Sequence, residues 1–392
     1  MMQHDAHPTP RPGDAHAFVG IVMAAGDAIA MRSARPKPLH RICGRTLAGH
    51  ALDTLQRAGV DRAVVVVSSG VDRVSKALQQ ESASDMAVSV VTQSQPLGSA
   101  DAVAVAVTAL DDDFDVLPTA AARRVLGSGS AAEVTDLVVL PSDRPLISHA
   151  TIRALIDAHQ QSSHIATILT ASMIDPDGHG IVIRGRGSRV EAVLDPSVAA
   201  LHHDWDAKTV HECDTGVMVI HLDLLAPALR RITRDGSGGS LSEVISVLVD
   251  AGYSIGTVMV DDPTEAMGVD DRVHLADVEA ELRRRTNAAL MASGVTMIDP
   301  LRTYVDATVR IAPDVTLFPG TMLQGSTQIG AGAEIGPDCR LVDTIVEEGA
   351  CVENSVARSC HIGAGAVVGP FAVLEPGSKV APGVRTGPSF TA

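Results

Sequence analysis

The sequence predicts an α/β domain joined by a helix to a short left-handed β-helix, and three observations support this fold class. In residues 18–270, short apolar segments alternate with amphipathic ones. Residues 272–293 have helical periodicity, mixed charge and no strand pattern. In the last 90 residues, aliphatic side chains recur at every sixth position. A period of six fits neither an α-helix nor an ordinary sheet, whereas it fits the flat sides of a β-helix.

The alternation in the N-terminal part indicates a mostly parallel sheet that is covered by helices, because the expected strands are apolar on both faces. The expected strands span residues 18–24, 63–67, 88–91, 137–140 and 165–170, and the expected helices span residues 47–58, 71–79, 100–110 and 152–159. We therefore expect a disordered tail at 1–17, an α/β domain at 18–270 with a surface insertion at 111–132, a linker helix at 271–294 and the β-helix at 295–392.

The six-residue period runs through two stretches of the C-terminal part. Its members are Val305, Ile311, Leu317, Leu323, Ile329, Ile335 and Leu341 and, after a break, Val356, Ile362, Val368, Leu374 and Val380. In a β-helix each hexapeptide makes one flat side, and three sides close a triangular coil. Residues 303–385 therefore supply about four to five coils. The alternative is ordinary strands that happen to have this spacing.

Length and composition exclude several classes of protein. A chain of 392 residues exceeds one ordinary core and predicts two domains. The net charge of −16 argues against nucleic-acid binding, which needs a basic face. The five scattered cysteines have no CxxC spacing and indicate neither a disulfide framework nor a zinc cluster. No run approaches the ~18 apolar residues of a membrane span, so we expect a cytoplasmic protein with no membrane partner.

A ligand-binding loop is expected after the first strand. Residues 19–23 lead directly into Ala24-Ala25-Gly26, and small residues let backbone N–H groups approach a base or a phosphate. Lys37 follows eleven residues after that glycine and can reach back to a phosphate. Taken alone, small residues at this place are more typical of close packing, and a lysine at a helix end is usually solvated. The order of motifs along the whole chain favours the ligand-binding interpretation.

These motifs are IVMAAG at 21–26, RPKPL at 35–39, QSQPLGS at 93–99, LPSDRPL at 140–146, DTG at 214–216 and GVD at 268–270. Their order, with the helix and the hexapeptide repeats behind them, resembles the bacterial bifunctional family that makes UDP-N-acetylglucosamine. In that family an N-acetylglucosamine-1-phosphate uridylyltransferase is fused to a glucosamine-1-phosphate acetyltransferase. The resemblance covers roughly residues 18–385 and implies that the domain at 18–270 is a nucleotide-diphospho-sugar transferase (Rossmann-like) domain.

The resemblance implies that a sugar phosphate attacks the α-phosphorus of UTP and that pyrophosphate leaves, with Mg²⁺ as cofactor. Asp143 and Asp270 match the magnesium ligands, with Asp270 in place of an asparagine, and Lys37 matches the phosphate-contacting lysine. Lys37 and Asp143 are the expected catalytic residues. The expected nucleotide-binding residues are Ala24, Ala25, Gly26, Lys37, Gln93, Gly98 and Ser99, and the expected sugar-binding residues are Gly180, Asp195 and Asp214.

Several of these residues also have simpler interpretations. Asp143 suits a helix cap or a turn, and Asp270 can equally cap the helix that starts nearby. A separate metal-binding hypothesis rests on residues 202–206 (HHDWD) with His211. That spacing matches no closed zinc site, and such a run is more often a solvated loop.

Departures from the family pattern support a second hypothesis for function. The family's loop Leu-Ala-Ala-Gly-x-Gly-Thr-Arg-Met is MAAGDAIAM here at 23–31, so Ala30 stands in place of the phosphate-binding arginine. Losing such a donor costs roughly 3–4 kcal/mol, or on the order of a hundred- to thousandfold in rate. Arg32 or Arg35 can substitute only if the loop is shifted. Asp195 and Asp214, which replace a glutamate and an asparagine, add carboxylates on the sugar side. The alternative is therefore a catalytically degenerate protein with a binding, scaffold or regulatory role.

The acetyltransferase activity of the family is expected to be absent. It needs an arginine in a Leu-Arg-Pro-Gly segment, which is Leu-Glu-Pro-Gly here at 374–377. It also needs further coils with basic residues and a histidine, whereas this chain stops at Ala392. Because related β-helices usually associate through flat coil sides, we expect a homotrimer.

Overall fold

The computed structural model describes residues 17–26, 29–68, 70–81, 86–95, 97–113, 134–174, 179–201, 209–232 and 239–391. The chain divides into two units, the first made of residues 1–40 and 47–270 and the second of residues 41–46 and 271–392. Nearly all of the expected tail, most of the expected insertion at 111–132 and the whole run 202–206 lie outside the described residues.

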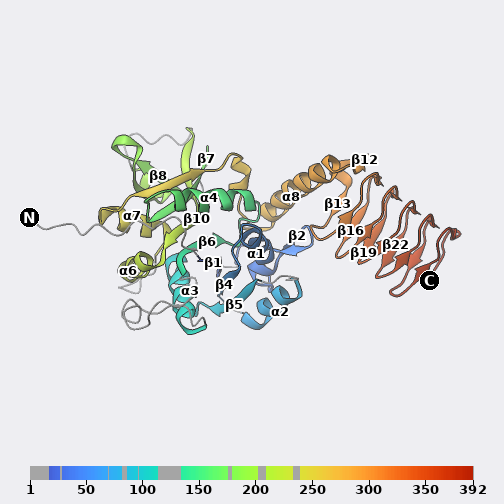
Figure 1. Ribbon diagram of the computed structural model, residues 1–392, viewed down its shortest axis with the longest axis horizontal. Coiled ribbons are helices and arrows are strands. Elements are labelled where there is room, and N and C mark those ends of the chain that lie inside the picture. The colour runs from blue at the N-terminus through green and yellow to red at the C-terminus, as the bar shows by residue number, and fades with distance from the viewer. Residues whose placement is uncertain are drawn as a thin grey trace, which may run out of the picture. The chain divides into compact units, whose positions relative to one another are not determined.

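A nine-stranded sheet forms the centre of the first unit (Figure 1). Its strands are β1 (Ala17–Ala24), β4 (Arg62–Val67), β5 (Ala87–Thr92), β6 (Val134–Pro141), β7 (Ala166–Met173), β8 (Gly180–Arg184), β9 (Val190–Leu194), β10 (His211–His221) and β11 (Ile255–Met259). The order is β11-β7-β10-β6-β1-β4-β5, with the hairpin β8–β9 beside β10. Strand β10 runs antiparallel to β6, β7 and β8. The predicted α/β class is confirmed, although the sequence pattern did not reveal β8 to β11.

Helices cover both faces of this sheet because its central strands are apolar on both sides. They are α1 (Leu47–Arg57), α2 (Val71–Glu81), α3 (Ser99–Asp113), α4 (His149–Gln161), α5 (Pro196–Ala199), α6 (Leu222–Ile232) and α7 (Leu241–Asp250), with short 3₁₀ turns η1 (Lys37–Leu39), η3 (Arg186–Ser188) and η4 (Pro263–Ala266). Val19 and Ile21 of β1 face a core shared with α3, α6 and α7. Val22 and Ala24 face a second core, shared with α1, α2 and α4.

The carboxyl ends of β1 and β6 meet at the edge where the topology reverses. From β1 the chain continues to β4 and β5 on one side, whereas β6 lies on the other side. Open α/β sheets bind ligands at such a switch point. A register shift in β10 between Asp214 and Met218 bends that strand at the same edge. Gly216 lies inside the shift with a φ of +77°, a conformation that favours glycine.

The second unit contains a long helix, a small hairpin and the coils of the β-helix (Figure 1). The helix is α8 (Arg272–Ala292), and the hairpin consists of β2 (Arg41–Ile42) and β3 (Arg45–Thr46). The coils contain β12 (Thr296–Met297), η5 (Pro300–Arg302), β13 (Tyr304–Val305), β14 (Arg310–Ile311), β15 (Thr316–Leu317), β16 (Met322–Gln324), β17 (Gln328–Ile329), β18 (Glu334–Ile335), β19 (Arg340–Val342), β20 (Ile345–Val346), β21 (Cys351–Val352), β22 (Val356–Arg358), β23 (His361–Ile362), β24 (Val367–Val368), β25 (Val373–Leu374) and β26 (Lys379–Val380). Every third strand pairs in parallel, which gives three five-stranded sides. The predicted β-helix is confirmed.

Shorter coils explain the break in the six-residue period after Leu341. Leu323 pairs with Leu341, 18 residues later, but Leu341 pairs with Ala357, only 16 residues later. The side chain that enters the core is therefore that of Ala357, whereas the sequence pattern was expected to resume at Val356. Val356 is half-buried instead. The coil after Leu341 is two residues shorter than the coil before it, but its strand still pairs in parallel with the preceding coil because the pairing register shifts by the same two residues.

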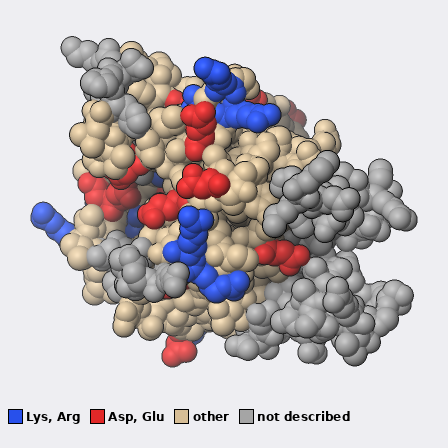
Figure 2. Space-filling model, turned by 90° about the vertical axis from the view of Figure 1, so that its left-hand side faces the viewer, with Lys and Arg blue, Asp and Glu red and all other residues tan. Residues whose placement is uncertain are grey.

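The surface of the chain carries both signs of charge. On the face shown in Figure 2, acidic side chains gather near the centre and basic side chains lie above and below them. The chain as a whole has 47 Asp and Glu residues against 31 Lys and Arg residues, a balance that disfavours polyanions. None of the described helices is both long and apolar enough to cross a membrane.

Candidate active site

A cavity of about 790 Å³ opens at the carboxyl ends of β1 and β6. Nine of the expected site residues line it: Ala25, Gly26, Gln93, Gly98, Ser99, Asp143, Gly180, Asp195 and Asp214. Ala24 is instead packed in the core beneath the loop. Lys37 and Asp270 do not line the cavity but contact Asp143, which does. Residues that are up to 233 positions apart in the sequence are therefore brought to one edge of the sheet.

Lys37 forms the centre of a small charged cluster. Its side chain is buried, and its Nζ donates to Oδ2 of Asp143 at 2.8 Å and to Oδ1 of Asp270 at 3.3 Å. A Cβ placed on Gly26 would lie 3.9 Å from this Nζ, so the lysine also borders the loop after β1. Two carboxylates that converge on one cation are the hard oxygen donors that Mg²⁺ prefers. The donor set therefore fits a divalent ion.

Helix capping does not account for either acid. The N-cap of α8 is Asp271, whose Oδ1 accepts hydrogen bonds from two N–H groups of the first turn, so Asp270 is not the cap. The N-cap of α4 is Ser148. The backbone oxygen of Asp143 accepts a hydrogen bond of 2.9 Å from the N–H of Val269. That bond holds the segment after β6 against the segment that carries Asp270.

The side of the cavity that the resemblance assigns to the nucleotide is built around Gln93. Its buried Nε2 donates to the oxygen of Gly98 at 3.0 Å and to Oδ2 of Asp101 at 2.8 Å. Gly98 has a φ of +95°, and a Cβ there would lie 2.5 Å from the oxygen of Gly239, so only glycine fits. The hydroxyl of Ser99 accepts from the first N–H of α7. Since both amide hydrogens of Gln93 are engaged, its Oε1 is the atom that can accept from a ligand.

On the side of the cavity that the resemblance assigns to the sugar, Asp214 is a buried carboxyl in a polar pocket. Its Oδ1 accepts from the N–H of Gly216 at 2.9 Å, and its Oδ2 accepts from the hydroxyl of Ser242 at 2.8 Å. Burial raises the pKa of Asp214 although these bonds oppose the change, which favours the neutral form. Gly180 lines the same region, where a Cβ would lie 2.6 Å from Cγ1 of Val193.

Asp195 also lines the cavity but is engaged locally. It accepts hydrogen bonds from both the N–H and the hydroxyl of Ser197, at the start of α5. These two bonds lower the pKa of Asp195, so it is ionised at neutral pH. The pKa values of Asp195 and Asp214 are therefore shifted in opposite directions, because Asp195 is exposed whereas Asp214 is buried.

Arg144 is a cavity residue that sequence reasoning missed. Among the described residues that line the cavity, it is the one lysine or arginine. Its guanidinium donates to the oxygen of Ala266. Its charge also acts to lower the pKa of Asp214 against the larger effect of burial, which places it on the sugar side. The only signal in the sequence was its position directly after Asp143.

The missing loop arginine has no substitute of the kind expected. Ala30, Arg32 and Arg35 are all exposed, and neither arginine lines the cavity. The neighbouring positions Asp27 and Ala28 lie outside the described residues. Among the described residues, Arg144 lines the cavity and Lys37 lies beside it in contact with Asp143.

Comparison with known proteins agrees with this fold and site. A family model described as a MobA-like NTP transferase domain matches residues 20–242, which include most of β1, all of β6 and the bend in β10. The chain is a sugar-1-phosphate nucleotidyltransferase. It is 35% identical over 370 residues to the bifunctional protein GlmU of Streptomyces avermitilis, which covers 94% of this chain and 71% of that protein. It is 37% identical over 362 residues to GlmU of Kineococcus radiotolerans (92% and 68%) and 34% identical over 370 residues to GlmU of Mycobacterium marinum (94% and 70%). The chain belongs to the GlmU family.

Proposed function

We propose that the chain makes UDP-N-acetylglucosamine and pyrophosphate from UTP and N-acetylglucosamine 1-phosphate. A phosphate oxygen of the sugar forms a bond to the α-phosphorus, the bond from that phosphorus to the bridging oxygen of the β-phosphate breaks, and pyrophosphate leaves. The observation that carries the proposal is the convergence of Lys37, Asp143 and Asp270 beside the cavity at the switch point.

The proposed cofactor is Mg²⁺, held by carboxylate oxygens of Asp143 and Asp270. A divalent ion there supplies positive charge against the crowded phosphates of substrate and leaving group. Lys37 places a further positive charge next to Gly26, on the side of the loop whose backbone N–H groups can bind a phosphate. Catalysis of this type relies on positioning and charge rather than on a covalent intermediate.

The environment of Gln93 supports uracil as the base. Both amide hydrogens of Gln93 bond within the protein, so its Oε1 is left as the atom with which this side chain can accept a hydrogen bond from a base. Uracil presents an N–H at N3, whereas cytosine presents an acceptor at that atom. A buried acceptor left opposite another acceptor is costly. UTP should therefore be preferred over CTP.

Pyrophosphate release in the presence of UTP, Mg²⁺ and N-acetylglucosamine 1-phosphate tests the proposal. Turnover is expected, and Asp143→Asn should lower kcat/KM by roughly a hundred- to thousandfold. Asp271→Asn is the matched control, because asparagine caps a helix as well as aspartate does and Asp271 lies outside the charged cluster. If the wild-type chain binds UTP but releases no pyrophosphate at high enzyme concentration, the proposal is wrong.

That last outcome would favour the alternative, a binding or regulatory protein without turnover. The alternative rests on Ala30 and on the carboxylates of the sugar side. The comparisons do not support it, since the relatives are members of one nucleotidyltransferase family.

We further propose that acetyl transfer is absent from this chain. Glu375 is exposed in the β-helix at the position where the family pattern has an arginine, so its charge is reversed there. Incubation with acetyl-CoA and glucosamine 1-phosphate should release no free coenzyme A thiol. Release above the background without enzyme would overturn this part of the proposal.

We also propose a cytoplasmic homotrimer, assembled through one side of the β-helix. Outward-facing side chains stack in register along the sheet β13-β16-β19-β22-β25, and they are Tyr304, Met322, Arg340, Val356 and Val373. Tyr304, Met322 and Val373 are each more than a third exposed, so this side presents outward a mostly apolar column that Arg340 interrupts. Such a column is the kind of surface that subunit association covers.

A further inference from the structure

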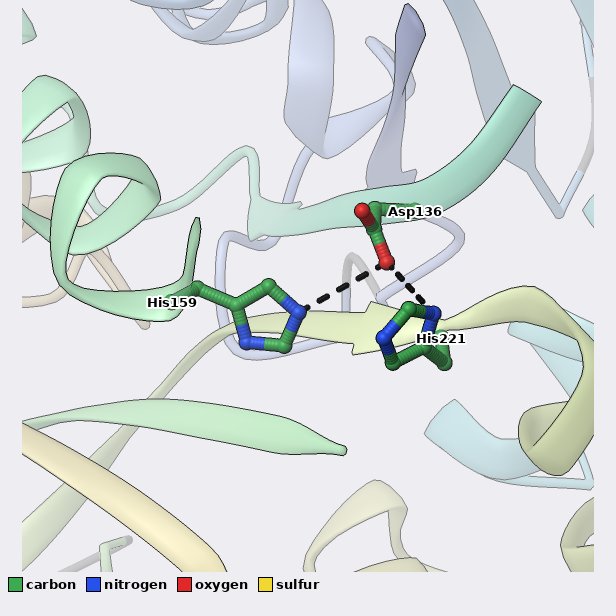
Figure 3. Close-up of side chains that lie close together, drawn as sticks. All are labelled: Asp136, His159 and His221. Carbon is green, nitrogen blue, oxygen red and sulfur yellow. Dashed lines mark ion pairs between the residues drawn. The ribbon is translucent and has the colours of Figure 1, made fainter. Parts of the chain in front are cut away.

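Three side chains with metal-ligating atoms converge at the end of β6 that lies away from the cavity. Asp136 lies near the start of β6, His159 lies in the last turn of α4, and His221 is the last residue of β10 (Figure 3). Asp136 and His221 face each other directly in the antiparallel pair of β6 and β10. One ligand atom from each of the three residues lies within 4.8 Å of the other two. The cluster takes no part in the site described above.

The distances show that both imidazoles approach one carboxylate oxygen. Nδ1 of His221 lies 2.9 Å from Oδ1 of Asp136, and Nε2 of His159 lies 3.6 Å from the same oxygen. The two rings are 5.5 Å apart and tilted by 54°, so they are not stacked face to face. Figure 3 shows both ring nitrogens directed at this oxygen. The three atoms therefore surround a common point.

His159 is oriented by a further contact and leaves one nitrogen unsatisfied. Its Nδ1 lies 2.9 Å from the hydroxyl oxygen of Thr167, which fixes the ring. Its Nε2 is buried and, among the described residues, has no hydrogen-bond partner, because 3.6 Å is too long for a hydrogen bond. When Nδ1 carries the proton given to Thr167, a lone pair on Nε2 points at a carboxylate oxygen. That arrangement is repulsive unless a cation lies between the two atoms.

We propose that Asp136, His159 and His221 bind a divalent transition-metal ion, with Zn²⁺ as the expected occupant. Zinc bonds to nitrogen and oxygen of about 2.0–2.1 Å at tetrahedral angles separate the ligand atoms by about 3.3 Å. The two separations of 2.9 and 3.6 Å lie on either side of that value, so small side-chain shifts suffice. Two imidazoles and one carboxylate favour such an ion over Mg²⁺, which prefers oxygen ligands.

The surroundings agree with a bound cation. Asp136 and His159 are each 3% exposed, whereas His221 is 33% exposed and leaves a route for the ion and for a water as fourth ligand. Asp136 and Asp143 are seven residues apart on and just after one strand, or about 20 Å. The ion would join β6, β10 and α4 rather than contact the substrates.

Zinc titration of chain purified without a histidine tag and stripped with a chelator tests the site. One Zn²⁺ per chain should bind, and bound zinc should raise the melting temperature by mass action. Loss of a residue that hydrogen-bonds a metal ligand weakens metal binding by roughly 10–100-fold. His221→Gln and His159→Gln each remove a proposed ligand itself, so each should weaken zinc binding by more than that. His202→Gln with His203→Gln is the matched control, since it removes two histidines outside the cluster and should leave binding unchanged.

Thr167→Val provides a finer test because it nearly keeps the shape of the side chain. It should weaken zinc binding by roughly 10–100-fold if Thr167 orients His159 as a ligand. Circular dichroism shows whether His159→Gln folds. If it does not fold, His221→Gln decides the test, because His221 is partly exposed. Absence of zinc binding by the wild-type chain overturns the proposal, as does binding that survives His221→Gln or is lost in the His202 and His203 variant.

Discussion

At the scale of single residues, the charge of the cavity depends on few side chains. Lys37 and Arg144 supply its cations, while Ala30 lacks the guanidinium that the family pattern has. Ala30→Arg should therefore raise kcat/KM for pyrophosphate release, by up to on the order of a hundredfold, because a donor aimed at developing charge acts in the transition state. Ala30→Gln is a control of similar length without charge. An arginine variant that is no faster than the glutamine variant would show that Lys37 and Arg144 already suffice.

Arg144 has a different expected role, because it lies beside Asp214 on the sugar side. Arg144→Gln should raise KM for the sugar phosphate by about tenfold or more, the effect of losing roughly 1.4 kcal/mol of binding to an anion, with a smaller change in kcat. Initial rates at varied sugar phosphate and saturating UTP measure both constants. Arg35→Gln removes an exposed arginine that does not line the cavity, so it should leave KM unchanged. Equal effects of the two substitutions would contradict the assignment.

These residues differ in how far the sequence alone could reveal them. Lys37, Asp143 and Asp270 were found because each belongs to a motif whose order matches a family, although their contact with one another required the fold. Arg144 lies in the same motif as Asp143, but no role was predicted for it from the sequence. The cluster of Asp136, His159 and His221 had no spacing signal, because three elements contribute one residue each and the register of β6 with β10 decides their meeting.

At the scale of elements, α8 contains an ion-pair network whose pH dependence can be stated. The hydrogen bond from Arg284 has the largest effect on the pKa of Glu281 and lowers it. Burial opposes this change, and the hydrogen bond from Arg285 lowers the pKa again, so that it lies at about 2 instead of its ordinary 4.5. Because the folded-state pKa is the lower one, the contribution to stability is complete above pH 4.5 and declines as the pH falls from 4.5 toward 2. Glu281→Gln should cost about 1 kcal/mol at pH 7 and progressively less below pH 4.5.

Urea unfolding followed by far-ultraviolet circular dichroism measures this change without screening the ion pairs. Glu279→Gln is the control on the same helix, since Glu279 is not part of the pair with Arg284 and Arg285. A cost for Glu281→Gln that is the same at pH 7 and pH 3.5 would contradict the linkage. So would a cost that grows as the pH falls.

The strands of both units also show which structural features a periodic sequence pattern cannot predict. The hexapeptide period predicted the coils, but it could not show that the coil after Leu341 is two residues shorter, because a shortened corner shifts the phase without changing residue type. Likewise, the apolar run at 217–220 is compatible with either direction of a strand. Its antiparallel direction in β10 follows only from the pairing with β6 and β7, and the bend at Asp214 follows from that pairing.

At the scale of the whole molecule, the two units bury their apolar side chains in different ways. The first unit buries both faces of an open sheet and leaves one edge for chemistry, at the topological switch point. The second unit buries one residue per hexapeptide in a narrow core and presents three flat sides. In the proposed trimer, the mostly apolar column on one of these sides is covered by other copies of the same chain.

Assembly is therefore expected to depend on the column that contains Met322. Met322→Glu replaces an apolar member of this column by a charged one. Bringing a carboxylate out of water into an interface costs several kcal/mol unless Arg340, its neighbour in the column, offsets the charge, and that cost is enough to dissociate a trimer at micromolar concentration. Gln328→Glu is the matched control, because residue 328 occupies the equivalent outward position on the next side of the same coil. Sedimentation velocity should show a trimer for the wild type and for Gln328→Glu but a monomer for Met322→Glu. A wild-type monomer, or a trimer that survives Met322→Glu, would show that this side of the β-helix is not the interface.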